Sequence, residues 1–563
     1  MLSNNLPRRI AARADTHPDR IAYRFLQRGE VEQRAFTYGE LDEAGRRLAS
    51  ALIDRLGGGS ALLVFEPGPE FAVTMMACLY AGIVVIPAPV PRRGASLERL
   101  KGIVQASGAA AILTTAEVAR GLVRSAADGG VLGDAAIVEV DALQDHLAEG
   151  RYPGFDLPAE APIFIQYTSG STLAPRGVVL NSACTLANID FTCRGVGFGE
   201  VEREVYVNWM PHFHDMGLIG NLVLSLVRGF ESVHLPPLAF VQDPARWLKA
   251  ITRYGATSTG GPPFAYDLCT KRVSDEDRAK LDLSSWRIAF CGAEPVFRSS
   301  LDAFAERFGA CGFKPEALIP VYGLAEVGVY AAGSPCGPTT DAAAGPIERA
   351  PCFLDAEAKD AIRIVSPDGM PLPEGQEGEI WFSHPSVAAG YLNDPEATAC
   401  AFNQTLQPDD GRLYLRTGDL GIVEGDLLNI TGRLKDVLIR NGVNIAAADV
   451  ERTATALDER IDRNGAAAFQ TEDFSREAIL IVEKARGESV DAGEERDLIL
   501  KMRSRVFDAL GLQLDRILIV EAGILPRTTS GKVQRSRARR SWNTSAAPAM
   551  PWQVAQARMP DAG

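Results

Sequence analysis

Short apolar runs alternate with amphipathic stretches through the first half of this chain, and this alternation limits the fold more than any other feature. Runs rich in Val, Ile and Leu, which are typical of buried strands, occupy residues 61–65, 84–87, 110–114 and 163–167. Between them, residues 38–56 and 70–80 place apolar side chains three to four positions apart, as one buried face of a helix does. Strand–helix–strand alternation predicts parallel sheets covered by helices on both faces.

The pattern changes after about residue 340, and 563 residues are too many for a single hydrophobic core. Apolar runs at residues 361–366, 378–383 and 421–430, joined by Gly, Pro and Asp turns, predict a small β subdomain at about 345–433. From residue 436 an α/β pattern restarts, with strands expected at 466–470, 478–483 and 516–521 and a helix at 496–510.

The predicted fold is therefore α/β. A large N-terminal domain of two parallel or mixed sheets plus the β subdomain covers residues 1–433, with a boundary at 433–436. A small, mobile C-terminal α/β domain follows at residues 436–542. Residues 543–563 are rich in Ala and Pro, and we expect them to form a flexible tail.

Charge and cysteine content exclude several classes of function. The net charge of −14 argues against nucleic-acid binding, which needs a basic surface. No apolar run is as long as the roughly 18–20 residues of a membrane span, and the first residues do not resemble a secretory signal. Nine cysteines without a CxxC pair predict buried thiols in a reducing compartment. We expect a soluble cytoplasmic protein that does not insert into membranes.

One segment, YTSGSTLAPRG at residues 167–177, follows a predicted strand and is rich in hydroxyls and glycines. Backbone N–H groups at glycine, together with Ser and Thr hydroxyls, form a concave surface of donors that suits phosphate oxygens. Arg176 adds a positive charge at its edge. The spacing matches neither a Walker A loop nor a dinucleotide-binding loop. Taken alone, such a segment is more often a surface turn.

Five further segments change that interpretation, because with the first they resemble, in order, the motifs of the adenylate-forming superfamily. That superfamily includes acyl-CoA synthetases, luciferases and the adenylation domains of peptide synthetases. The five segments are GAEPV at 292–296, VYGLAE at 321–326, YLRTGD at 414–419, GRLKD at 432–436 and PRTTSGK at 526–532. Within the superfamily, WMPHFHDMGLIG at 209–220 and PPFAYDLC at 262–269 are most similar to fatty acyl-AMP ligases.

That resemblance implies an enzyme that uses ATP to convert a fatty acid, or a related carboxylic acid, to an acyl-AMP with release of pyrophosphate. The acyl group then passes to the phosphopantetheine thiol of an acyl carrier protein, as in polyketide or nonribosomal peptide assembly. Alternatives with the same intermediate are an acyl-CoA ligase and an enzyme for aryl or amino acids. A nucleotide-binding or carrier-docking module without catalysis is a further alternative, although Lys532, Glu326 and Asp419 are all present.

Roles for individual residues also follow from the resemblance. Lys532 matches the lysine that bridges the attacking carboxylate and the α-phosphate, and Glu326 matches the ligand of Mg²⁺, a cation that prefers oxygen donors. Tyr322 would stack on adenine, Asp419 would bind the ribose hydroxyls with Arg433 nearby, and Lys435 would be the hinge between domains. The full set of nucleotide-binding candidates is Thr168, Ser169, Gly170, Ser171, Thr172, Arg176, Gly177, Gly292, Ala293, Glu294, Tyr322, Gly323, Leu324, Asp419 and Arg433.

The HDMG segment supplies the candidates for binding the acid. His214, in preference to its neighbour His212, is the candidate catalytic histidine that orients the carboxylate or gates its entry. Asp215 is either part of that chemistry or a support for the loop. Candidates for lining an acyl pocket, which are almost as well explained as plain core residues, are Met210, Asp215, Met216, Leu218 and Gly261.

Four features depart from the family pattern. Leu173 replaces the usual Gly of the phosphate loop, and Arg176 replaces the usual Lys, so the charge is kept with a different geometry. Pro263 stands where the subfamily usually has Asn. Only about forty residues separate Glu326 from the strand at Ile364, so the insertion that fatty acyl-AMP ligases usually carry there, and that disfavours CoA, is short or absent. This last departure favours the acyl-CoA ligase alternative.

Overall fold

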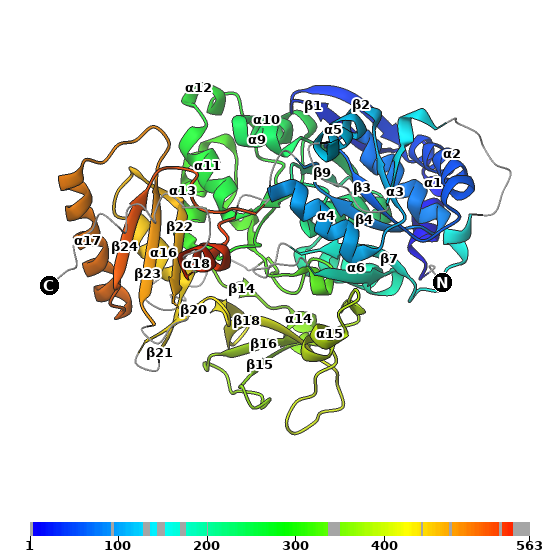
Figure 1. The fold of residues 1–563 in the computed structure, drawn as a ribbon. Helices are drawn as coiled ribbons and strands as arrows, with labels where there is room; N and C mark the ends of the chain where they lie inside the picture. The colour runs from blue at the N-terminus through cyan, green and yellow to red at the C-terminus, as the bar shows by residue number, and fades with distance from the viewer. Residues whose placement is uncertain are drawn as a thin grey trace.

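Two seven-stranded sheets form the larger part of the molecule, and a five-stranded sheet and a small C-terminal domain lie against them (Figure 1). In this structure, a computed structural model, the residues described are 4–91, 95–127, 135–143, 152–168, 176–199, 201–335, 349–440, 443–471, 476–528 and 532–543. The α/β fold class expected from the sequence is confirmed.

The first sheet has the order β17-β8-β7-β4-β3-β5-β6. Strands β7, β4, β3, β5 and β6 run parallel to one another, and β8 is antiparallel to both of its neighbours, β7 and β17. The four predicted strands are all present within one or two residues. The bounds are β3 (Ser60–Val64), β4 (Val84–Ala88), β5 (Ala111–Thr114), β6 (Ala136–Glu139), β7 (Pro162–Tyr167), β8 (Gly177–Asn181) and β17 (Gly390–Tyr391).

Helix α2 (Tyr38–Leu56) shows how the amphipathic pattern produces this packing. Thr37 and Glu40 form a capping box that satisfies N–H groups of the first turn, and the helix ends at Gly57 in the left-handed conformation. Its buried face packs on α3 (Pro69–Ala81). At Gly45 the two helices are so close that a Cβ would lie 3.0 Å from the Cβ of Met76.

The second sheet has the order β13-β12-β11-β9-β10-β1-β2, and only the β1–β2 hairpin is antiparallel. The carboxyl ends of its parallel strands therefore meet at one edge, where ligands bind in open α/β sheets. Its strands are β1 (Ile21–Gln27), β2 (Val31–Thr37), β9 (Val205–Asn208), β10 (Glu231–His234), β11 (Ser258–Gly261), β12 (Ile288–Cys291) and β13 (Leu318–Pro320).

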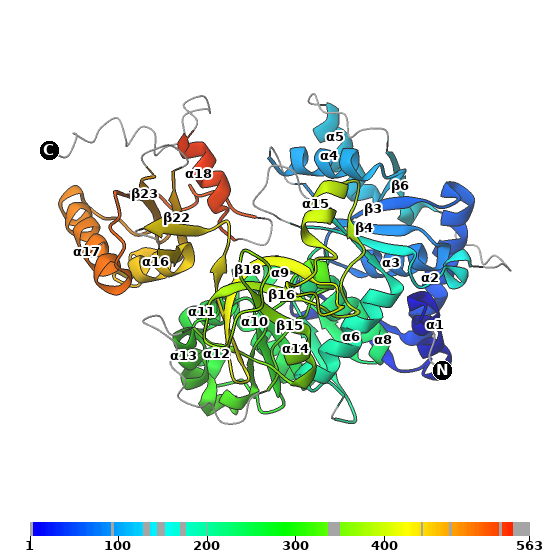
Figure 2. The same cartoon turned by 90° about the horizontal axis from the view of Figure 1, so that it is seen from below.

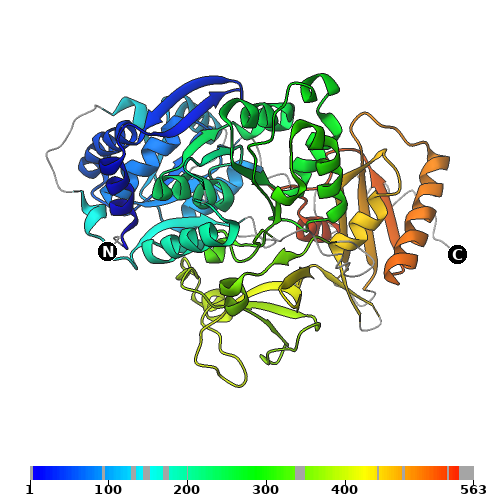
Figure 3. The ribbon, with the colours of Figure 1, turned by 180° about the vertical axis from the view of Figure 1, so that it is seen from behind.

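Helices of the N-terminal part cover these two sheets, as Figures 1 and 3 show from opposite sides. The largest hydrophobic cluster joins α2 and α3 to residues of both sheets. Besides α2 and α3, these helices are α1 (Leu6–Thr16), α4 (Ala95–Ser107), α5 (Ala116–Ala127), α6 (Ser182–Val196), α7 (Asp215–Gly217), α8 (Leu224–Arg228), α9 (Pro237–Gln242), α10 (Ala245–Tyr254), α11 (Pro263–Arg272), α12 (Asp275–Arg278) and α13 (Arg298–Phe308).

The β subdomain is an antiparallel sheet of order β14-β19-β18-β16-β15. One expectation was wrong in detail, because residues 421–430 are a hairpin and not a single strand. The chain turns at Gly425, whose φ of +60° suits glycine, and Val423 pairs with Leu428. The elements are β14 (Cys352–Phe353), α14 (Ala356–Ala361), β15 (Ile362–Val365), β16 (Gly378–Phe382), α15 (Pro395–Ala401), β18 (Leu415–Glu424) and β19 (Leu427–Arg433).

The C-terminal part begins with the β20–β21 hairpin and has hydrophobic clusters of its own. Figures 1 and 2 show it at the end of the molecule opposite the N-terminus. Its three-stranded sheet pairs β22 antiparallel and β24 parallel to β23. The elements are β20 (Val437–Arg440), β21 (Val443–Ala446), α16 (Ala447–Thr455), β22 (Ile461–Gln470), β23 (Ala478–Lys484), α17 (Ala492–Leu510), β24 (Arg516–Val520) and α18 (Arg535–Asn543).

The predicted boundary at 433–436 coincides with the turn between β19 and β20, and its role as a domain boundary stays a prediction. The predicted tail, apart from Asn543, lies outside the described residues. Within the ranges given above, no helix combines the length and apolar character needed to cross a bilayer. Among the described cysteines all eight are free thiols, and seven of them are buried.

Inside the C-terminal part, Arg535 of α18 makes a two-pronged ion pair with Glu451 of α16, at 2.6 and 2.7 Å. It also contacts Asp436 at 3.3 Å. The Glu451 carboxylate also accepts a hydrogen bond from the backbone N–H of Ala468 in β22. Arg535 therefore joins the start of this part to its last helix.

Replacing Arg535 by Ala is expected to leave the buried Glu451 carboxylate without its cation and to destabilise the C-terminal part by about 3 kcal/mol or more. Hydrogen exchange of the amides in α16 and β22 measures the effect. The control is Arg537→Ala, which removes an exposed arginine of the same helix. Equal exchange rates in the two variants would contradict the assigned role of the ion pair.

Candidate active site

The predicted phosphate loop connects two antiparallel strands, β7 and β8. Its ends are held together by a hydrogen bond of 3.0 Å from the Thr168 N–H to the Arg176 carbonyl. Gly177 packs so tightly that a Cβ there would lie 2.7 Å from Ile165 Cγ2. The candidates Ser169, Gly170, Ser171 and Thr172, together with Leu173, lie outside the described residues.

The Arg176 side chain lies against β17 and the residues that precede α15. Its guanidinium carbon is 5.2 Å from the centre of the Tyr391 ring, and its Nε is 3.4 Å from the Asp394 carboxylate. Both contacts are ones that a planar guanidinium makes well. They hold Arg176 directly before the start of β8, where its charge remains partly exposed.

The GAEPV segment follows β12 and brings backbone, not side chains, to the site. A Cβ on Gly292 would lie 2.4 Å from the carbonyl oxygen of Val321, so only glycine allows this approach of two strand ends. Ala293 has a φ of +67°, which is strained for a residue with a Cβ. Glu294 is half-buried next to it. The strained turn leaves the Ala293 carbonyl free to accept a hydrogen bond from another part of the chain.

Tyr322, Asp419 and Arg433 form the most tightly connected group of the site. The Tyr322 hydroxyl donates to Asp419 Oδ2 at 2.8 Å, and Arg433 Nε donates to Asp419 Oδ1 at 2.6 Å. Asp419 and Arg433 are directly opposite each other in the β18–β19 ladder, so the sheet register fixes the pair. Burial raises the pKa of Tyr322 and the Asp419 carboxylate raises the pKa of Arg433. The tyrosine therefore stays neutral and the arginine charged.

The loop after Tyr322 turns sharply and presents Glu326. Gly323 is essential to that turn, since a Cβ would lie 1.7 Å from the carbonyl oxygen of Val329, while Leu324 is buried below it. Glu326 accepts a hydrogen bond of 2.8 Å from the Tyr391 hydroxyl. Burial raises the pKa of Glu326. Glu326 thus offers an oxygen-donor carboxylate whose position is set by the Tyr391 hydroxyl.

Lys532 reaches the N-terminal part from the loop before α18. Its Nζ donates to the Ala293 carbonyl at 2.5 Å, across 239 residues of sequence. Further contacts join the same parts: Arg349 pairs with Asp449, and the Arg452 guanidinium donates to the Ser299 and Ser300 hydroxyls at 3.1 and 3.2 Å. The predicted hinge residue Lys435 is exposed in the turn between β19 and β20.

His214 and Asp215 lie at the start of the short helix α7, which continues as a π-helical turn at Leu218–Val223. His214 Nδ1 is 2.6 Å from Asp215 Oδ1. Burial opposes ionisation of Asp215, but His214, the Met216 N–H and Lys532 outweigh it and lower the pKa of Asp215.

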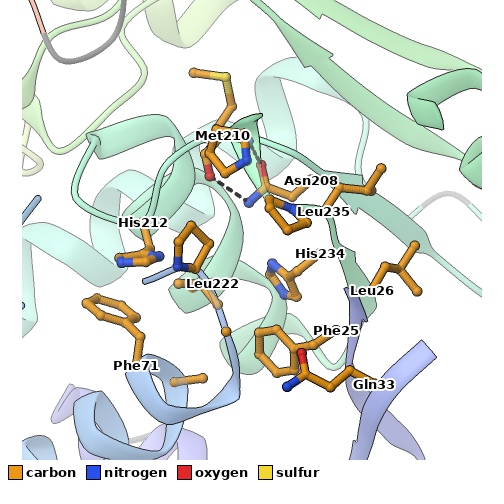
Figure 4. A pocket seen from close by; sticks show the side chains of 15 residues that line it. Phe25, Leu26, Gln33, Phe71, Asn208, Met210, His212, Leu222, His234 and Leu235 are labelled. Atoms are coloured by element: carbon orange, nitrogen blue, oxygen red, sulfur yellow. Dashed lines mark hydrogen bonds between the residues drawn. The ribbon is translucent and has the colours of Figure 1, made fainter. Parts of the chain in front are cut away.

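The candidates for the acyl pocket are divided by the structure. Met210 lines a cavity in the N-terminal part (Figure 4), whereas Met216 and Leu218 are buried in two hydrophobic clusters and do not line it. Gly261 ends β11 against Trp209, where a Cβ would lie 2.5 Å from the indole ring. Met216, Leu218 and Gly261 are therefore explained by packing, and their role in binding an acid stays a prediction.

Most of the residues of this site lie within stretches of the chain that match known protein families. The family described as AMP-binding enzyme matches residues 10–392, which is more than half of the chain. The family described as Disco-interacting protein 2-like, AMP domain, matches residues 435–550. The chain is an AMP-binding enzyme.

Relatives of this AMP-binding enzyme extend along nearly its whole length. The medium-chain-fatty-acid acyl-carrier-protein ligase JamA of Moorena producens is 34% identical, with 92% of each chain covered. The 4-hydroxyphenylalkanoate adenylyltransferase of Mycobacterium tuberculosis is 32% identical and covers 95% of this chain and 91% of the relative. A solved structure from a study of fatty acyl-adenylate ligases of E. coli and L. pneumophila has 27% identity, a TM-score of 0.83 and 98% coverage of both chains. The resemblance drawn from the motifs is confirmed.

Two candidate functional residues in this AMP-binding enzyme, Tyr391 and His234, were not anticipated from the sequence. Tyr391, which contacts both Glu326 and Arg176, has no local signal beyond an aromatic residue after a glycine. His234 ends β10, whose sequence Glu-Ser-Val-His carries no signal that distinguishes this histidine. It lines the same cavity as Met210 and His212.

Replacing Asp419 by Asn is expected to weaken ATP binding by about 10- to 100-fold, the range for losing a hydrogen bond to a charged group. The KM for ATP in pyrophosphate exchange measures it. Tyr322→Phe is the matched variant: it keeps the ring and removes only the hydroxyl that donates to Asp419, so a smaller increase is expected. An unchanged KM for ATP in Asp419→Asn would contradict a nucleotide-binding role.

Proposed function

We propose that this enzyme converts a fatty acid and ATP to an acyl-AMP and pyrophosphate, and then transfers the acyl group to the phosphopantetheine thiol of an acyl carrier protein. The observation that supports it best is the Lys532 ammonium at the Ala293 carbonyl, beside the Tyr322–Asp419–Arg433 group. Relatives named for fatty-acid activation and carrier-protein ligation support the choice of acid and acceptor.

In the proposed first step, a carboxylate oxygen attacks the α-phosphorus of ATP and the bond to pyrophosphate breaks. Both reactants are anionic, so the enzyme has to hold them in line and balance the negative charge that builds up. Lys532 is proposed to bridge the carboxylate and the α-phosphate. Tyr322 would bind the adenine, and Asp419 would accept hydrogen bonds from the ribose. The phosphates would lie in the loop between Thr168 and Arg176.

Mg²⁺ is proposed to accompany ATP, with Glu326 as its ligand. No three His, Cys, Asp or Glu residues gather into a metal site anywhere in the described part of the chain. That fits a cation that uses one or two carboxylates plus substrate phosphates. Glu326 supplies a carboxylate whose pKa responds to the charges of Arg433 and Asp419. Bound there, Mg²⁺ would neutralise phosphate charge.

In the proposed second step the thiol attacks the mixed anhydride, AMP leaves and a thioester forms. The C-terminal part, residues 436–542, would act as a lid that turns about Lys435 after adenylation. Exposure of Lys435 in a turn supports this, since such a residue can change its backbone angles without disturbing a core. CoA is the alternative acceptor, favoured by the short segment between Glu326 and β15.

Two alternatives for the acid remain. A hydroxyphenylalkanoate is favoured by the relative that bears this substrate in its name. An amino acid would need a free carboxylate for its ammonium group, and Asp215 is already engaged by His214 and the Met216 N–H. The amino acid is therefore the weaker candidate. We place the reaction in the cytoplasm, without nucleic-acid partners, in keeping with the acidic charge and free thiols.

Pyrophosphate exchange with a panel of fatty, aryl and amino acids tests the first step. Thioester formation with CoA and with a holo acyl carrier protein then tests the second. We expect exchange with fatty acids and thioester only on the carrier. Exchange with amino acids alone would contradict the substrate class, and thioester on CoA alone would contradict the acceptor.

Replacing Lys532 by Ala is expected to reduce adenylation by about 10²- to 10³-fold, the scale for removing one donor that stabilises transition-state charge. Thioester formation from supplied acyl-AMP should be nearly unchanged. Lys501→Ala, which removes an exposed lysine of α17, is the control. Equal losses in both half-reactions would contradict the proposal that Lys532 acts in adenylation and not in thioester formation.

Replacing Glu326 by Gln removes the charge that is proposed to hold Mg²⁺ while keeping the shape of the side chain. We expect the Mg²⁺ concentration needed for half-maximal exchange to rise by roughly tenfold or more. Glu306→Gln, on the exposed face of α13, is the matched control. An unchanged Mg²⁺ requirement would show that Glu326 does not bind the metal.

A further inference from the structure

A cavity lies between the two large sheets, next to the segment that carries His214. Figure 4 shows its walls, which come from the β1–β2 hairpin, the start of α3, the segment after β9, and the end of β10. The centre of a water molecule can occupy about 30 Å³ of this cavity. The lining residues are Phe25, Leu26, Gln33, Pro67, Gly68, Phe71, Ala72, Asn208, Met210, His212, Leu222, His234, Leu235, Pro236 and Pro237.

Two imidazoles are the unusual feature of this otherwise largely apolar lining. His212 is 8% exposed and stacks on Phe71 with ring centres 3.9 Å apart, and His234 is 9% exposed and stacks on Phe25 at 5.0 Å. The Nε2 atoms of both rings are buried, and neither has a hydrogen-bond partner among the residues that the structure describes. Since buried polar atoms nearly always have partners, these two atoms indicate that a polar group binds in the cavity that both rings line.

The charge state of the two imidazole rings limits which chemical groups can bind in the cavity. Burial lowers the pKa of His212 to about 4 and that of His234 to about 3, so both are neutral at pH 7. The Phe65 carbonyl accepts a hydrogen bond from His212, which leaves the lone pair on Nε2. A neutral imidazole lone pair needs a donor. A carboxylate or phosphate has no proton to give and would find no cation in these rings.

Size and ligand number exclude two other occupants. A metal ion would need a third ligand, and no described His, Cys, Asp or Glu completes such a set. An aromatic ring is too large for the space given above, which exceeds the roughly 10–15 Å³ needed for one water molecule by only about twofold. A hydroxyl group fits: it both donates and accepts a hydrogen bond, and the aliphatic carbon that carries it suits side chains such as Leu26 and Leu222.

The position of the cavity connects it to the reacting acid. His212 is two residues before His214, so the cavity wall and the His214–Asp215 pair are at most about 7 Å apart along the chain. We propose that His212 and His234 form a subsite that binds a hydroxyl group on the aliphatic chain of the acid substrate. This rests on the proposed activation of a fatty acid, and it makes the preferred substrate a hydroxylated one.

The test is pyrophosphate exchange with the full-length enzyme and two matched sets of acids. One set is unsubstituted fatty acids of increasing length, and the other carries a single hydroxyl moved along the chain. We expect one hydroxyl position to raise kcat/KM by about 10- to 100-fold over the unsubstituted acid of equal length, because that acid leaves both imidazoles without a partner.

Variants then test the residues. His212→Leu and His234→Leu are expected to lose the preference for the hydroxylated acid and to keep exchange with the unsubstituted one. His234→Gln, which retains a polar atom near the Nε2 position, is expected to restore part of the preference. The matched control is His384→Leu, which removes a half-buried histidine, stacked on Phe191 and outside the cavity, and should leave the preference unchanged.

The outcomes separate the two proposals. Equal exchange with unsubstituted and hydroxylated acids in the unmodified enzyme would overturn the subsite, leave the fatty-acid activity intact, and mean that the cavity holds only water. A preference that survives both leucine variants would overturn the role of the histidines, and it needs no assumption about their folding. Absence of exchange with every acid would overturn the proposed function and the subsite together.

Discussion

The ion pair between Asp419 and Arg433, with the Tyr322 hydroxyl on the second carboxylate oxygen, is the interaction on which the site depends. Asp419 and Arg433 are neighbours in an antiparallel ladder, whereas Tyr322 follows the edge strand of a different sheet. One buried carboxylate thus fixes the β subdomain against the second large sheet. A charge so placed is stable only with its partners, so the geometry around the nucleotide candidates is defined before any ligand binds.

The C-terminal part is held to this frame by polar contacts and not by a shared hydrophobic core. Its clusters contain only residues from 438 onward, and Lys532, Arg349 and Arg452 make polar contacts across the boundary. Polar contacts exchange readily for water, whereas a shared apolar core does not. This division is what a lid needs if it is to bring one lysine to the site and then withdraw it.

Much of the candidate site was predictable because its residues belong to motifs whose chemistry is local. Gly292 and Gly323 are required because a Cβ at either position would lie only 2.4 or 1.7 Å from a backbone carbonyl oxygen, and Asp419 and Arg433 lie 14 residues apart at opposed positions of one hairpin. The sequence analysis treated residues 421–430 as one strand, because an apolar run interrupted only by a Gly-Asp turn resembles a continuous strand. The structure shows the β18–β19 hairpin there. Met216, Leu218 and Gly261 could not be separated from core residues by sequence, because burial and ligand lining select the same side chains.

The sequence by itself determined the α/β class, the enzyme family and the residues of the six motifs, because strand–helix alternation and short-range spacing are properties of neighbouring residues. Only the tertiary structure decided which distant groups meet. It brought Lys532 to Ala293, Tyr391 to Glu326 and Arg176, and His212 to the same cavity as His234. These contacts depend on how sheets and domains pack, and packing is set by the whole core and not by any segment of the chain.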